Sequence, residues 1–209
     1  GKKVLLVDID PQGNATSGLG VNLGDNQKGT YELLLGEASI EQVVYSTDIE
    51  TLKVVPSNVD LAGAEIELVG RSQREKILSG ALNGVRVEYE FVIIDCPPSL
   101  GLLTLNALAT SQSVLIPMQC EYYALQGLNH LLKTLKRVKK SINPDLKVEG
   151  ILLTMYDSRT LLAAQVEDQV KKYFNEFLMK TIIPRNIRLS EAPSHGKPII
   201  LYANRSKGS

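Results

Sequence analysis

Short runs of β-branched residues alternate along this chain with longer stretches of helical period, and this alternation constrains the fold more than any other feature. Several of the runs are apolar throughout, which is typical of strands covered on both faces of a parallel sheet. Strands that alternate with helices predict right-handed βαβ crossovers and an α/β fold with a doubly wound, mostly parallel sheet and helices on both faces. The predicted strands are Val4–Asp8, Leu52–Pro56, Phe91–Asp95, Ser113–Pro117, Val148–Thr154 and Thr181–Ile183.

Two longer helices are predicted in the second half of the chain. Within residues 122–142 the leucines and other apolar residues form one stripe, and the basic residues fall largely outside it. Within residues 160–175 apolar residues recur every four positions. Pro144 ends the first of these helices, because proline cannot continue the hydrogen-bond ladder.

The length and composition are those of one ordinary globular domain. The chain has 209 residues, of which 44% are hydrophobic and 22% charged. No apolar run approaches the roughly 18–20 residues needed to cross a bilayer. Cys96 and Cys120 lack metal-ligand spacing and are predicted to be small buried thiols, a cysteine usage that fits a reducing cytoplasm.

The net charge of zero conceals an asymmetry. Residues 1–132 carry 8 Lys and Arg against 16 Asp and Glu, a net −8, whereas residues 133–209 carry 15 against 7, a net +8. A polarised distribution of this kind can steer a polyanion to one face. The charges can also simply solvate helix surfaces, and the count alone does not decide between the two.

Two predicted strands end in aspartate. Ligands of doubly wound sheets bind beyond the carboxyl ends of the strands, so both ends are candidate sites. Asp95 ends an apolar strand, which is the Walker B pattern for a carboxylate on the magnesium side of a nucleotide. Asp8 and Asp10 are spaced i, i+2 at the other strand end, where one carboxylate can orient water. A polar turn with Asp10 as a helix cap remains the alternative.

In order along the chain, these motifs resemble those of the ParA/Soj partitioning ATPases. The resemblance covers essentially the whole chain. It is carried by Asp8-Ile9-Asp10-Pro11-Gln12-Gly13-Asn14 within residues 4–20, by Asp95-Cys96-Pro97-Pro98-Ser99 within 93–101, and by residues 119–125, 153–157 and 183–193.

The resemblance implies specific roles. Asp10 matches the carboxylate that positions the attacking water, Asp8 matches a supporting acid, and Asp95 matches the magnesium-side carboxylate. The segment that frames the adenine is matched by Pro184, Arg185 and Asn186, with Asn186 as the expected base contact. Arg159 and Arg188 match positions where family members present DNA-contacting arginines.

For the whole protein, the resemblance implies a Mg·ATP-driven homodimer that binds double-stranded DNA without sequence preference. A ParB/Spo0J-type partner is expected to stimulate hydrolysis of ATP, in the cytoplasm and at the nucleoid. Five further lysines could extend the DNA face, although each could equally be a solvated surface residue; they are Lys133, Lys136, Lys171, Lys172 and Lys197.

One departure from the family concerns the phosphate-binding loop. The family opens with a strand and a Lys-Gly-Gly-x-Gly-Lys-Thr run, and no Gly-Lys-Ser/Thr occurs in these 209 residues. We expect residues 1–209 to form a single domain without the first strand, the P-loop, most of the first helix and the last helix. Such a piece should bind ATP poorly and be inactive alone.

Two other functions compete with the ATPase switch. A non-catalytic DNA- or protein-binding module could use the same fold without hydrolysis, although it would not need Asp8, Asp10 and Asp95 together. A relative that positions the division machinery on membranes usually carries a C-terminal amphipathic helix, and none is seen here. The sequence therefore favours the switch, with no membrane partner expected.

Overall fold

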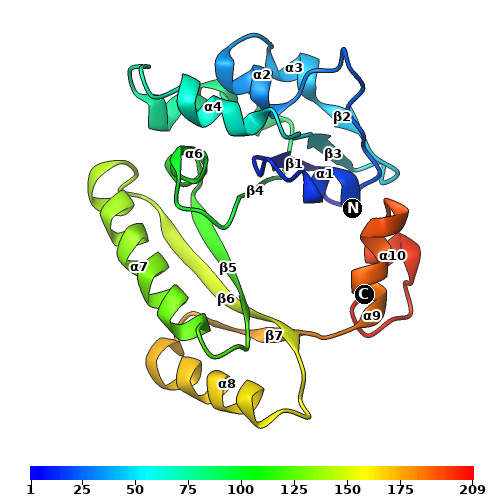
Figure 1. Cartoon of the computed structure of the whole chain (residues 1–209), viewed down its shortest axis with the longest axis vertical. Coiled ribbons are helices and arrows are strands. Elements are labelled where there is room, and N and C mark those ends of the chain that lie inside the picture. Colours follow the sequence, from blue (N-terminus) through cyan, green and yellow to red (C-terminus); the bar gives the residue numbers. More distant parts are fainter. The chain divides into compact units, whose positions relative to one another are not determined.

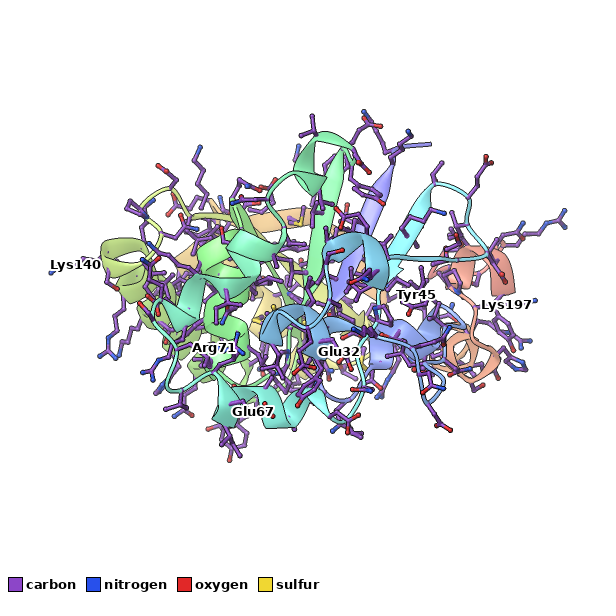
Figure 2. All side chains as sticks on the ribbon, turned by 90° about the horizontal axis from the view of Figure 1, so that it is seen from above. Glu32, Tyr45, Glu67, Arg71, Lys140 and Lys197 are labelled. Atoms are coloured by element: carbon purple, nitrogen blue, oxygen red, sulfur yellow. The ribbon has the colours of Figure 1, made fainter. Side chains whose placement is uncertain are left out.

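The computed structural model describes the backbone of residues 1–209 and every side chain except that of Arg86 (Figures 1 and 2). The chain divides into two compact units. Unit 1 comprises Gly1–Thr110 and Ala192–Pro198, and unit 2 comprises Ser111–Glu191 and Ile199–Ser209. Hydrogen bonds join the described strands into two sheets, and four of the five pairings between strands are parallel. The predicted mostly parallel α/β class is confirmed.

Unit 1 is built on a four-stranded sheet in the order β2-β3-β1-β4. Only the pairing of the short β2 with β3 is antiparallel. The strands are β1 (Val4–Asp8), β2 (Tyr45–Ser46), β3 (Leu52–Val55) and β4 (Phe91–Asp95). The helices are α1 (Asn14–Gly18), α2 (Thr30–Leu35), α3 (Ile40–Val43), α4 (Leu61–Glu67), η1 (Arg74–Lys76), α5 (Ile77–Ala81), η2 (Val85–Val87), α6 (Leu102–Thr110) and η3 (Ala192–His195).

Unit 2 is built on a three-stranded parallel sheet in the order β5-β6-β7. The helix α7 contacts β5, α8 contacts β7, and the two helices contact each other (Figure 1). The strands are β5 (Ser113–Gln119), β6 (Lys147–Tyr156) and β7 (Leu178–Pro184). The helices are α7 (Ala124–Ser141), α8 (Leu161–Phe174), α9 (Ile187–Glu191) and α10 (Ile199–Tyr202).

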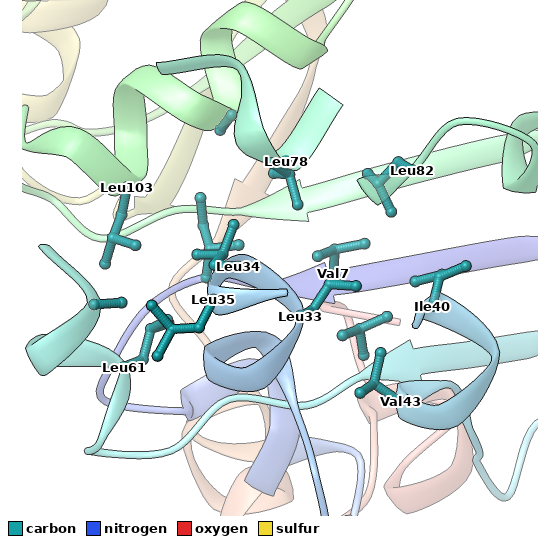
Figure 3. Packing of buried hydrophobic residues seen from close by; sticks show 14 of the residues in the cluster. Val7, Leu33, Leu34, Leu35, Ile40, Val43, Leu61, Leu78, Leu82 and Leu103 are labelled. Atoms are coloured by element: carbon teal, nitrogen blue, oxygen red, sulfur yellow. The ribbon is translucent and has the colours of Figure 1, made fainter. Parts of the chain in front are cut away.

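The core of unit 1 lies between the sheet and the short helices (Figure 3). Val7 of β1 is fully buried, and α2 contributes the consecutive buried residues Leu33, Leu34 and Leu35. The helix α2 ends at Gly36, whose φ of 76° is a left-handed conformation that glycine adopts without steric penalty. Burial of this apolar surface is the main favourable term that holds β1, and with it Asp8, in place.

One expectation about the strands is wrong for β4. The apolar run Phe91–Asp95 was expected to be covered on both faces, but Phe91 is 55% exposed and Ile93 is 53% exposed. Val92 and Ile94 alternate with them and pack against the core. Because successive side chains of a strand point to opposite faces, only one face of this edge strand is covered.

Most predicted strand bounds agree with the structure. Val4–Asp8 and Phe91–Asp95 are confirmed as predicted, and β6 and β7 extend a few residues beyond the predicted runs. The two-residue strand β2 was not predicted. Among the described residues, no helix is both long and apolar enough to cross a membrane.

Candidate functional site

The two aspartates that end strands lie side by side at the carboxyl edge of the unit 1 sheet. In the parallel β1–β4 register, Asp8 is paired with Asp95. The backbone N–H of Ile9 donates to the carbonyl oxygen of Asp95 at 2.9 Å, which continues the ladder past the last paired residues. Two residues 87 positions apart in the sequence are therefore brought together by the register.

Asp8 is completely buried, and its carboxylate is held by three donors. Its Oδ1 accepts from the backbone N–H of Asp10 at 3.1 Å. Its Oδ2 accepts from the backbone N–H of Thr16 at 2.9 Å and from the Thr16 hydroxyl at 2.7 Å. Hydrogen bonds to a carboxylate stabilise its charged form, so these donors compensate for burial. Asp8 thereby fixes the loop that carries Asp10.

The Thr16 hydroxyl extends this network to the next strand. It accepts from the backbone N–H of Ser57 at 2.9 Å, just beyond the end of β3. On the other side, the Thr30 hydroxyl donates to the carbonyl oxygen of Asp8 at 2.6 Å and lies 3.1 Å from that of Pro56. The end of β1 is therefore tied to the end of β3 through two buried threonines.

Asp10 lies in a turn rather than at a helix cap. Its Oδ1 accepts from the backbone N–H of Gln12 at 3.0 Å, an Asx turn. The cap of α1 is instead Gly13, with a left-handed φ of 60°. A Cβ at Gly13 would lie 3.0 Å from the carbonyl oxygen of Ser57, so the turn approaches the β3 end closely. The half-buried Asp10 keeps part of its carboxylate accessible to solvent.

The three carboxylates act on one another electrostatically. Burial, then the charge of Asp8, then that of Asp10, raises the pKa of Asp95 to about 6. The neighbouring Cys96 thiol is half-buried, and burial together with the same three carboxylates raises its pKa to about 12. Cys96 is therefore a protonated thiol at neutral pH, although it and Cys120 are half-buried rather than buried as predicted.

This negative charge is suited to a divalent cation. Within the described part of the chain, no lysine or arginine forms an ion pair with any of the three aspartates. No group of three or more acidic, histidine or cysteine side chains there forms a ready-made metal cage. Magnesium usually takes only one or two carboxylates together with waters and phosphates, so the half-buried Asp95 fits such a site.

In unit 2 a cleft of about 220 Å³ opens at the carboxyl ends of the three strands. Arg185 lines it, and its backbone N–H donates to the carbonyl oxygen of Tyr156 at 2.9 Å. Pro184 ends β7, and Asn186 Oδ1 accepts from the backbone N–H of Arg188 at 2.8 Å, so Asn186 caps α9. The other lining residues are Gln119, Cys120, Glu121, Met155, Asp157, Thr160, Leu162 and Ala163.

Of the predicted adenine segment, only Arg185 lines this cleft. Met155 also lines it, with a φ of 50° that is rare for a residue with a side chain. Backbone strain of this kind clusters at functional sites.

The two predicted DNA-contacting arginines lie on different elements of unit 2, and each is paired with a carboxylate. Arg159, between β6 and α8, binds Asp157 through two hydrogen bonds of 2.9 and 2.7 Å. These bonds lower the pKa of Asp157 to about 2. Arg188 of α9 lies 2.8 Å from Glu191. Both arginine side chains are largely exposed, so each could exchange its internal partner for a phosphate.

The sequence did not single out the threonines of the Asp8 network. Thr16 lies in the short helix α1 and Thr30 begins α2, and their roles arise from contacts with residues 8 to 41 positions away. A single weak signal was available: Thr16 follows the Asp-x-Asp motif within one short, glycine-flanked segment.

Comparison with known proteins gives a consistent set of relatives. A family model described as an AAA domain matches residues 1–148. Over 209 residues the chain is 58% identical to the sporulation initiation inhibitor protein Soj of Bacillus subtilis, covering all of this chain and 83% of that protein. It is 57% identical over 208 residues to the chromosome partitioning protein ParA of Myxococcus xanthus, covering 99% of this chain and 73% of that protein.

Solved structures share the fold. The cobyrinic acid a,c-diamide synthase of Mycobacterium smegmatis, with a bound ATP analogue and magnesium, matches with a TM-score of 0.83 and 41% identity, covering 94% of this chain and 79% of that one. The apo McdA structure from Cyanothece matches with a TM-score of 0.88 at 20% identity, which bears on the fold alone, and covers 99% of this chain and 84% of that one.

Proposed function

This chain belongs to the ParA/Soj family of chromosome-partitioning ATPases, and from that premise we propose that it is part of an ATP-dependent switch for DNA segregation. In this proposal Mg·ATP drives homodimerisation, the dimer binds double-stranded DNA without sequence preference, and a ParB/Spo0J-type partner stimulates hydrolysis. The protein acts in the cytoplasm, in association with the nucleoid. The observation that carries the proposal is the convergence of Asp8, Asp10 and Asp95 at one sheet edge.

The geometry supports a division of labour among the three carboxylates. Asp8 has its oxygens occupied by internal donors, so we assign it a positioning role. Asp10, which retains accessible carboxylate surface, orients the attacking water. Asp95 holds the magnesium side of the site, directly or through water. When bound, Mg²⁺ neutralises charge on the phosphate oxygens.

The nucleotide base is assigned to unit 2. We propose that Pro184, Arg185 and Asn186 frame the adenine at the carboxyl edge of the β5-β6-β7 sheet. The cleft lined by Arg185 and Met155 supports this assignment, because strand ends of this kind are the usual ligand site of the fold. The side-chain oxygen of Asn186 accepts from Arg188, so its contact with the base would use the amide nitrogen as donor.

DNA binding is assigned to unit 2 as well. Arg159 and Arg188 suit phosphate because the planar guanidinium binds two oxygens at once. Their location in the half of the chain with a net charge of +8 favours approach to a polyanion. Binding of this kind is expected to weaken steeply with salt.

The 209 residues of this chain do not include a phosphate-binding loop. No Gly-Lys-Ser/Thr run occurs among them, and that loop provides most phosphate contacts in P-loop enzymes. We therefore propose that this chain alone binds Mg·ATP weakly and does not turn it over. Isothermal titration of the 209-residue chain should show no saturation at micromolar Mg·ATP, and micromolar affinity would overturn this part of the proposal.

A non-catalytic binding module is the competing function. Three carboxylates gathered at one sheet edge, with the charged form of Asp95 disfavoured by burial and by the other two, would serve no purpose in such a module. Hydrolysis by the protein as its gene encodes it decides between the two functions: turnover that needs Mg²⁺ supports the switch, and ATP-independent DNA binding without turnover supports the module.

A further inference from the structure

The longest helix of the described chain, α7, presents two chemically opposite faces. Leu128, Leu135 and Val138 are buried on the side that packs against β5 and α8. The opposite side carries four cations spaced i, i+3, i+4 and i+7, a spacing that places side chains on one helix face. We name this surface the basic face of α7; it comprises Lys133, Lys136, Arg137 and Lys140.

The basic face is exposed and carries no compensating acid. All four residues are exposed, and α7 contains no aspartate or glutamate at all. Figure 2 shows Lys140 pointing away from the ribbon near the end of α7. The ion pairs found among the described residues involve other lysines and arginines, so no carboxylate neutralises the basic face.

This arrangement differs from that of the two arginines assigned to DNA. Arg159 and Arg188 each hold an internal carboxylate, which a phosphate would have to displace. The residues of the basic face hold no internal carboxylate that a phosphate would have to displace. The unpartnered charge of the basic face therefore favours an external polyanion more directly than either arginine does.

Helix stability does not account for the basic face. Like charges at i, i+3 and i, i+4 repel each other, so the cluster weakens α7 in isolation. The negative end of the helix dipole attracts cations within the last turn, which explains Lys139 and Lys140. Lys133 and Lys136 lie beyond the reach of that end, so their clustering requires another explanation.

We propose that the basic face of α7 is a further phosphate-contacting surface for duplex DNA, and this inference rests on the DNA binding proposed above. Seven residues of helix rise span about 10 Å. Duplex DNA carries one phosphate charge per about 1.7 Å of its axis, so several phosphates lie within reach of that span. Long flexible lysines and one arginine suit contacts to phosphates without reading of bases.

The test uses the protein as its gene encodes it, with Mg·ATP, and measures affinity for a random-sequence duplex across a salt series. Lys133, Lys136, Arg137 and Lys140 are all changed to glutamine, which preserves helix propensity. The matched control changes the same number and kind of exposed cations in unit 1: Lys3→Gln, Lys28→Gln, Arg71→Gln and Lys76→Gln. Circular dichroism confirms the fold of both variants.

The α7 variant should lose more than tenfold in affinity at low salt, and its log–log salt slope should fall by about 0.9 for each phosphate contact removed. The control variant should bind the duplex with nearly the affinity and the salt slope of the parent. Parent-like affinity and slope in the α7 variant, or an equal loss in the control, would overturn the inference while leaving DNA binding intact. A parent that binds no duplex would instead overturn the proposed function. An α7 variant that binds DNA normally but loses binding to polyglutamate would assign the face to an acidic protein.

Discussion

The hydroxyl of Thr16 donates to the buried carboxylate of Asp8 at 2.7 Å while it accepts from the backbone N–H of Ser57 at 2.9 Å. One hydroxyl therefore joins the end of β1 to the chain that follows β3. This relationship explains how the Asp8 carboxylate is tolerated at zero exposure and why it supports the loop rather than reacting itself.

Substituting Thr16→Val tests that network. Valine has the same shape but neither donor nor acceptor, so the Asp8 carboxylate and the Ser57 N–H each lose a buried partner. We expect the free energy of unfolding to fall by about 1–3 kcal/mol in urea titration. Thr16→Ser, which keeps the hydroxyl, should recover most of the loss. Equal stability of the valine variant and the parent would contradict the network.

The raised pKa of Asp95 predicts a pH-dependent stability in a chelator-containing buffer. The folded state, with a pKa of about 6 against an ordinary 3.8, retains a proton that the unfolded chain has released between these values. Stability should therefore fall as pH rises from about 4 to 6 and stay low above that window. Asp95→Asn should be more stable than the parent at pH 7.5, and the difference should shrink toward pH 4. A parent as stable as the variant at pH 7.5 would contradict the assigned environment.

A backbone contact between Gly20 and Gly196 fastens the loop after α1 to the segment after η3. A Cβ at Gly20 would lie 2.7 Å from the carbonyl oxygen of Gly196, and both residues have positive φ. Gly20→Ala should lower the free energy of unfolding by more than about 1 kcal/mol, because strain and overlap add. Gly80→Ala is the matched control: it lies in α5 with open space around it and should stabilise by up to about 1 kcal/mol. Similar changes in the free energy of unfolding for Gly20→Ala and Gly80→Ala would contradict a close contact between Gly20 and Gly196.

The arginines assigned to DNA can be tested in both directions. Arg159→Ala and Arg188→Ala should each weaken duplex binding and reduce the salt slope by about 1. Asp157→Asn should strengthen binding, because it releases the Arg159 guanidinium from its two hydrogen bonds. Fluorescence anisotropy over a salt series measures both effects. Unchanged binding in both alanine variants would remove the arginines from the DNA surface.

Much of the fold and part of the site could be predicted from sequence, because those features depend on local patterns. The runs that end in Asp8 and Asp95 are recognisable strands, and parallel pairing brings their ends together. The apolar stripe of α7 could likewise be predicted from the helical spacing of its apolar residues. The roles of Thr16 and Ser57 could not be predicted, since they depend on a contact between residues 41 positions apart.

Two further features could be established only from the structure and not from the sequence. The exposure of Phe91 and Ile93 depends on whether other elements pack on their face of β4, and no property of the run itself reveals it. The pairing of Arg159 with Asp157 depends on side-chain rotamers in the turn between β6 and α8. Both arise from neighbours in space rather than from residue type.

The proposed role of Asp10 in an ATP-driven switch is tested most directly by the rate of Mg²⁺-dependent ATP hydrolysis. This rate is measured for the protein as its gene encodes it, in the presence of duplex DNA, for the parent and for Asp10→Ala. We predict turnover in the parent and at least a tenfold lower rate in the variant, with ATP affinity retained, because a water-orienting carboxylate contributes about 10²–10⁴-fold. Equal rates in the two proteins, or no turnover in the parent, would contradict it.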